Sequence, residues 1–151
     1  MKRELLVLQN FFLLVGVIFA GYNVVNEIIR YLAVGGSWLM FRIPDSLWNP
    51  LLAPCFWGFV VFFIAFVWSI TLRIDYSKAS QYRLIWLLGL GAIFAWGNYG
   101  YELGALYRNE VCNLGCVPGY FGIPQFTSCV VGAVIFTSAL VAAVRLRRLD
   151  K

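Results

Sequence analysis

Four long stretches without a charged side chain constrain the fold of this sequence more than any other feature. They are residues 5–22, 51–72, 84–101 and 126–144. The last three are 22, 18 and 19 residues long. About 20 apolar residues in a helix span the roughly 30 Å hydrocarbon core of a bilayer. Because the bilayer interior offers backbone groups no water, we expect each stretch to form a helix.

The sequence therefore predicts a single all-α domain over residues 1–151, an integral membrane four-helix bundle. The expected helices are about 5–34, 51–72, 84–102 and 124–145, with external loops at 35–50 and 103–123. Gly35 and Gly36 are expected to end the first helix. Its apolar stretch has a basic start but no small-residue cleavage site after it, so we expect a retained helix and not a signal peptide.

The basic residues are segregated between the two sides that these helices would create. Nine of the twelve fall on one side: Lys2, Arg3, Arg73, Lys78, Arg83, Arg145, Arg147, Arg148 and Lys151. The positive-inside rule makes that side cytoplasmic, so both termini are expected inside a cell membrane, either inner or plasma. The net charge of +5 is then a topology signal and an attraction to membrane lipid, and no nucleic-acid partner is expected.

The chain contains no histidine, which removes the commonest general base and the usual haem ligands. No Ser/His/Asp set can form, and we expect no haem or metal. Within the helices, Glu27 and Arg30 are three residues apart and are expected to pair. Asn98 is expected to bond to a neighbouring helix. Glycines 89, 91, 97 and 100 would let neighbouring helices approach closely.

Four cysteines remain as candidates for chemistry: Cys55, Cys112, Cys116 and Cys129. Cys112 and Cys116 fall in the second external loop. Cys55 and Cys129 lie roughly 6–8 Å below the external starts of their helices, at 1.5 Å per residue. All four would therefore face an oxidising compartment, in which disulfides persist.

Three interpretations of these cysteines compete. They could form two structural disulfides, Cys112–Cys116 and Cys55–Cys129, where the second requires adjacent helices with Cα atoms within about 7 Å. They could form a redox relay between the same pairs. A four-cysteine zinc site is the third, but the usual C-x2-C spacing is missing. A Cys112–Cys116 disulfide closes so small a loop that it would contribute only about 2 kcal/mol, a weak structural reason for it.

The first external loop is rich in aromatic residues, among them Trp48. Tryptophan favours the headgroup layer, so the loop would anchor the chain along the membrane surface. A lid over a lipid-soluble ligand is the alternative.

Two local motifs resemble the quinone-coupled disulfide bond formation protein B family, with the vitamin K epoxide reductases as broader relatives. Pro54 and Cys55 begin the second helix as a proline-cysteine does in that family. Cys112 and Cys116 precede an aromatic-Gly-apolar-Pro stretch, residues 121–124. The resemblance implies a four-helix bundle that oxidises a soluble thioredoxin-like thiol partner and passes the electrons to quinone, here near Trp57 and Trp48.

The sequence departs from the family pattern in the second helix. The family has Cys-x-x-Cys followed by an arginine, whereas this chain has Gly58 and Phe62 at the second cysteine and the arginine. Either Cys129 has taken over as the partner of Cys55, or the chain is a relative that has lost quinone chemistry. The resulting hypothesis is a membrane thiol–disulfide oxidoreductase. A non-catalytic accessory subunit of a larger membrane complex is the alternative, favoured by the aromatic content of 18% and the few polar groups.

Overall fold

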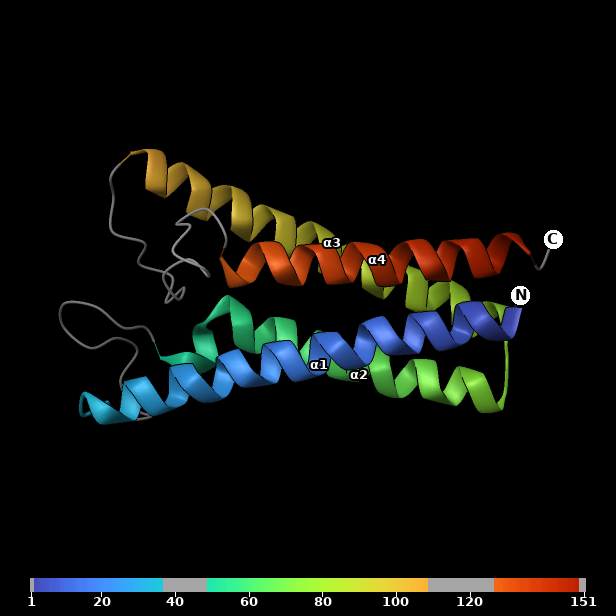
Figure 1. Ribbon diagram of the computed structural model, residues 1–151, viewed down its shortest axis with the longest axis horizontal. Helices are drawn as coiled ribbons and strands as arrows, with labels where there is room; N and C mark the ends of the chain where they lie inside the picture. Colours follow the sequence, from blue (N-terminus) through green and yellow to red (C-terminus); the bar gives the residue numbers. More distant parts are fainter. Residues whose placement is uncertain (1, 37–48, 109–126, 150–151) are drawn as a thin grey trace.

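The computed structural model describes residues 2–36, 49–108 and 127–149, and throughout these ranges its regular elements are helices. The elements are α1 (Lys2–Ala33), the short 3-10 helix η1 (Pro50–Leu52), α2 (Pro54–Ile74), α3 (Lys78–Tyr107) and α4 (Ser128–Arg148) (Figure 1). The prediction of an all-α fold is confirmed for this part of the chain.

The four long helices run antiparallel to their neighbours in the chain. α1 packs against α2 and α4, and α3 packs against α4 and, less extensively, α2. α2 and α4 therefore occupy opposite corners of the bundle. The beginning of α1 and the end of α4 lie at the same end of the molecule (Figure 1).

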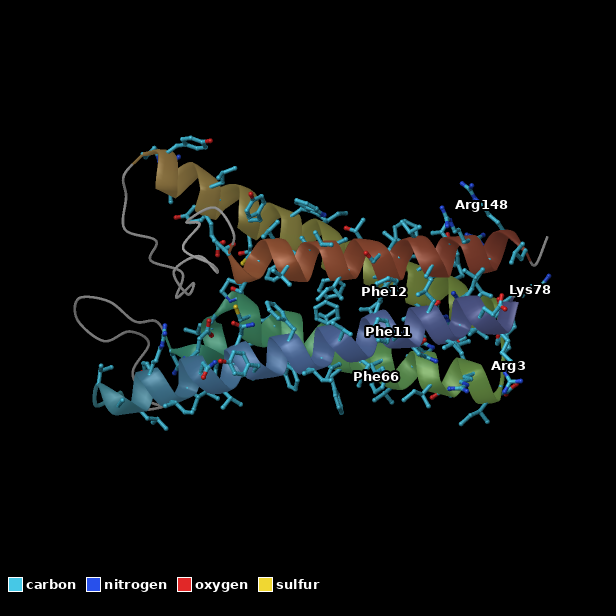
Figure 2. The ribbon with its side chains drawn as sticks, in the orientation of Figure 1. Arg3, Phe11, Phe12, Phe66, Lys78 and Arg148 are labelled. Atoms are coloured by element: carbon cyan, nitrogen blue, oxygen red, sulfur yellow. The ribbon has the colours of Figure 1, made fainter. Side chains whose placement is uncertain are left out.

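That end carries most of the positive charge, and we call it the basic end. Figure 2 shows Arg3, Lys78 and Arg148 gathered there, from three different helices. The opposite end, where α2 and α4 begin, contains Cys55 and Cys129 and is called the cysteine end. The antiparallel order thus brings together the basic residues that the sequence places on one side.

Helix boundaries follow local chemistry. α1 ends at Ala33, as Gly35 and Gly36 predict: Gly35 has φ 80° and the N–H of Gly36 bonds to the Tyr31 carbonyl at 3.0 Å. α3 extends beyond the predicted 84–102 at both ends. An apolar stretch marks the part of a helix that suits a bilayer, and polar residues such as those before residue 84 continue the helix without interruption.

Two stacked aromatic rings fill the middle of the bundle. Phe62 and Phe136 have ring centroids 3.7 Å apart and planes inclined by 14°. Glycines on the two other helices make room for them, since a Cβ at Gly16 would lie 2.4 Å from Phe62 and one at Gly91 would lie 2.6 Å from Phe136. Of the four glycines predicted to allow close packing of α3, Gly91 meets a neighbouring side chain, whereas glycines 89, 97 and 100 have nothing within 4 Å.

A buried polar network joins all four helices towards the basic end. The Gln9 amide on α1 donates to the Ser69 hydroxyl on α2 at 2.7 Å. The Gln81 amide on α3 donates to the Gln9 side-chain oxygen and to the Ala143 carbonyl on α4, each at 3.2 Å. All three side chains are fully buried. The network satisfies polar groups that an apolar core would otherwise leave unpaired.

The outside of the bundle is apolar. Large hydrophobic side chains such as Phe11 and Ile93 are 57% and 71% exposed. Contiguous apolar surface of this kind is rare on soluble monomers. α1, α2 and α4 are each long and apolar enough to cross a membrane.

Candidate thiol–carboxylate site

One cavity at the cysteine end brings together two cysteines from opposite corners of the bundle. Cys55 is the second residue of α2 and Cys129 is the second residue of α4. Because both helices begin at the same end, the two cysteines lie at the same level. Both line a cavity of about 50 Å³, whose floor is the Phe62–Phe136 stack.

The two thiols are free in this structure. The Cys55 sulfur lies 3.6 Å from the hydroxyl oxygen of Ser128, the residue that precedes Cys129. The predicted disulfide required α2 and α4 to be adjacent, but the two helices are diagonal. They meet at the Cys55–Ser128 contact and at the Phe62–Phe136 stack. The Cys55–Cys129 disulfide stays a prediction.

Cys129 is hydrogen-bonded to a carboxylate. Its thiol donates to Oε1 of Glu102, on α3, over a distance of 3.0 Å. Cys129 and Glu102 are 8% and 4% exposed, so the bond is shielded from water. A hydrogen bond is electrostatically stronger in such surroundings than in water.

Cys55 lies beside a second carboxylate, that of Glu27 on α1. Glu27 is 8% exposed, and neither of its oxygens makes a well-formed hydrogen bond with the described residues. The predicted pairing of Glu27 with Arg30 is reduced to electrostatic attraction, because Glu27 turns into the bundle while Arg30 is exposed.

Sequence reasoning missed Glu102, which it took for the end of the third span. The available signal was its spacing from Asn98. Glu102 lies four residues further on, about one turn along a helix that continues to Tyr107. The prediction for Asn98 was wrong: its amide donates to the Phe94 carbonyl of its own helix at 2.7 Å. Asn23 does the same to Phe19 at 2.8 Å. Both asparagines line the cavity, so each turns a donor away from it.

A groove on the outside of the bundle borders the cavity. The groove, about 370 Å³ in volume, lies between α2 and α3 and is lined almost entirely by apolar side chains. Gly58, Phe94 and Phe136 line both the groove and the cavity. A Cβ at Gly58 would meet nothing within 4 Å, so there is free space beside this residue where groove and cavity adjoin.

The remaining predicted site residues are placed as follows. Trp57 lines the groove and is 51% exposed. Cys112, Cys116 and Trp48 lie outside the described residues. Within the described ranges, no three potential metal ligands converge, so Cys55, Cys129, Glu27 and Glu102 form two thiol–carboxylate pairs and not one four-ligand centre.

The chain matches no family model, no curated protein and no solved structure. The chemistry open to this site therefore follows from its own residues. They are a half-buried thiol, Cys55, and a buried thiol, Cys129, each beside a carboxylate, with an apolar groove next to the cavity that both cysteines line.

Proposed function

We propose that this chain is a membrane thiol–disulfide oxidoreductase, with Cys55 and Cys129 as its inner redox pair. All four helices would cross an inner or plasma membrane, with the basic end in the cytoplasm and the cysteine end outside. The apolar outer surface and the segregation of basic residues support this placement. The cysteines would then face an oxidising compartment.

The observation that carries the proposal is the shared cavity of Cys55 and Cys129. Two cysteines on diagonal helices have no packing reason to lie at the same level beside one cavity. The Cys55 sulfur already contacts Ser128, next to Cys129. Bringing the sulfurs into bonding distance requires the Cys129 side chain to turn from Glu102 towards Cys55.

The proposed reaction balances as follows. Cys55 and Cys129 lose two electrons and two protons to a quinone, forming one S–S bond and leaving a quinol. A thiolate of the Cys112–Cys116 pair then attacks this disulfide, and exchange transfers the S–S bond to the external pair. A soluble thioredoxin-like dithiol attacks that bond in turn and leaves oxidised, which restores all four starting thiols.

The groove between α2 and α3 is the proposed quinone site. It opens on the outer surface beside Trp57, and its volume of about 370 Å³ contrasts with about 50 Å³ in the cavity. One water needs about 10–15 Å³, and a dry engineered cavity that binds benzene has about 150 Å³. The quinone ring would therefore rest in the groove and approach the sulfurs past Gly58.

The test is a single-turnover experiment, in which purified, fully reduced protein reacts with a short-chain quinone in the absence of an external dithiol. We expect two quinones to be reduced per chain, one for each of its two dithiols, with the Cys55–Cys129 and Cys112–Cys116 disulfides found by mass spectrometry. Cys55→Ser and Cys129→Ser should each abolish both signals. If the wild-type chain reduces no quinone and keeps both thiols, the proposal is wrong.

A matched variant separates the two cysteine pairs. The double substitution Cys112→Ser/Cys116→Ser should still reduce one quinone per chain, through the inner pair, but stop steady-state oxidation of an external dithiol. In the unreduced wild-type protein, mass spectrometry should find Cys112 bonded to Cys116. Free thiols at both positions would contradict the relay while leaving the inner pair untouched.

One observation favours the accessory-subunit alternative. The Cys129–Glu102 hydrogen bond satisfies a buried thiol and a carboxylate without any chemistry. A subunit of this kind would co-purify with a larger membrane complex under mild detergent and would reduce no quinone. An oxidoreductase would be isolated alone and would retain the single turnover.

A further inference from the structure

Two buried glutamates stand beside the two cysteines, and the reaction proposed above gives them no role yet. The Cys129 sulfur is 3.0 Å from the Glu102 carboxylate, and the Cys55 thiol faces the Glu27 carboxylate. The four residues come from four different helices. Each thiol thus has its own carboxylate, one within the α1–α2 hairpin and one within the α3–α4 hairpin.

A purely structural role explains the Glu27 carboxylate poorly. Burying a carboxylate is costly unless it is neutral or well bonded. Glu27 is 8% exposed, yet its oxygens make no well-formed hydrogen bond with the described residues, and the nearby cation, Arg30, is itself exposed. Ionisable groups at such depth in a bundle are more often functional than structural.

We propose that Glu102 and Glu27 accept the protons that Cys129 and Cys55 release when the pair is oxidised. This inference rests on the proposed function, which supplies the quinone as oxidant. Two S–H bonds break and one S–S bond forms. Two electrons pass to the quinone, and one proton passes to each carboxylate. Both protons then pass from the carboxylates to the reduced quinone, which becomes the quinol.

The surroundings leave few competing acceptors. The cavity is lined mainly by apolar groups, and the asparagines at positions 23 and 98 offer amides that cannot take a proton at ordinary pH. Glu27 is within electrostatic reach of Arg30 and Glu102, and the Cys55 thiol also faces the Ser128 hydroxyl. A proton acceptor must lie within hydrogen-bond reach of the proton it takes, which the Cys129–Glu102 distance satisfies.

The experiment compares disulfide formation in reduced wild-type protein, Glu102→Gln and Glu27→Gln after mixing with a short-chain quinone. Glutamine keeps the size and one oxygen acceptor but cannot take the proton. We expect each variant to form the Cys55–Cys129 disulfide roughly 100-fold more slowly, the usual lower range for loss of a general base. The variant rate should rise with external pH, and Glu102→Asp should recover most of the rate.

Glu4→Gln is the matched control, because Glu4 is an exposed glutamate at the basic end. It should leave the rate unchanged. If both site variants form the disulfide at the wild-type rate, the carboxylate proposal is overturned while the redox pair stands. If the wild-type protein forms no disulfide, both proposals fail together.

A second measurement, on the wild-type protein, tests the proposal even if the glutamine variants do not fold. Time-resolved infrared difference spectra of wild-type protein, recorded after mixing with quinone, should lose the S–H stretch and transiently gain the C=O stretch of a protonated carboxylic acid. Loss of S–H without that gain would contradict proton transfer to a glutamate. Carbon-13 labelling of glutamate identifies the band, since it shifts only carboxyl vibrations of that residue type.

Discussion

Phe62 and Phe136 stack face to face at the centre of the bundle, their centroids 3.7 Å apart, and so join the diagonal helices α2 and α4. The stack also closes the cavity beneath Cys55 and Cys129. The stack therefore contributes to core packing. It also limits how deep a molecule near the cysteines can go into the bundle.

The first prediction concerns the glycine that accommodates this stack. Gly16→Ala would place a Cβ 2.4 Å from the Phe62 ring, which is buried and would have to shift from its stacked position on Phe136. We expect a loss of about 1–3 kcal/mol in the free energy of unfolding, typical of overpacking. Gly97→Ala is the control, because its Cβ would meet nothing within 4 Å, and it should gain roughly 0.5–1 kcal/mol from helix propensity. Detergent denaturation curves measure both.

The second prediction tests the polar network towards the basic end. Gln9→Leu removes the bonds to Ser69 and Gln81 and leaves buried polar groups without partners, at a cost of about 1–3 kcal/mol. A double-mutant cycle with Ser69→Ala should give a coupling energy of about 0.6–2 kcal/mol, the range for side-chain bonds between membrane helices. Ser138→Ala, which breaks a bond within α4, is the control. Zero coupling would mean that Gln9 and Ser69 stabilise the bundle independently.

The third prediction concerns the passage beside Gly58. Gly58→Leu would fill the opening shared by the groove and the cavity and keep a quinone ring away from the sulfurs. We expect quinone-driven disulfide formation to slow by roughly a hundredfold, as misplacement of a reactant does. Gly97→Leu adds the same side chain at an open position of α3 and should have no effect. Equal rates in both variants would remove the groove as the route of entry.

The fourth prediction is the orientation in the membrane. The basic residues of α1, α3 and α4 gather at one end, so a reporter fused after Lys151 should behave as a cytoplasmic protein. An extracellular tag at the same place would put the cysteines in a reducing compartment. That result would remove both the orientation and the redox proposal.

Parts of this fold follow from the sequence because they depend on local chemistry. Uncharged stretches of sufficient length predict the helices, and the Gly35–Gly36 pair predicts where α1 ends. The antiparallel order then determines which basic residues meet. The extent of α3 could not be predicted, because apolar length reports what suits a lipid interior and not where a helix ends.

The site was predicted less completely. The helix starts place Cys55 and Cys129 at one level, as their distance from the expected helix starts indicates. Their relation to Glu27 and Glu102 depends on which helices are neighbours, and periodicity does not determine that. Asn98 shows the same limit. The side-chain amide of a helix residue can bond either to a neighbouring helix or to the backbone of its own helix, and Asn98 bonds to its own backbone.

The Gln9–Ser69–Gln81–Ala143 network has a mechanical consequence for the opposite end. It holds all four helices together where they carry most positive charge. Towards the cysteine end, the diagonal helices α2 and α4 touch only through a few contacts, among them Cys55 with Ser128 and Phe62 with Phe136. A relative shift of these two helix ends would therefore change the sulfur–sulfur separation while the network at the other end stays in place.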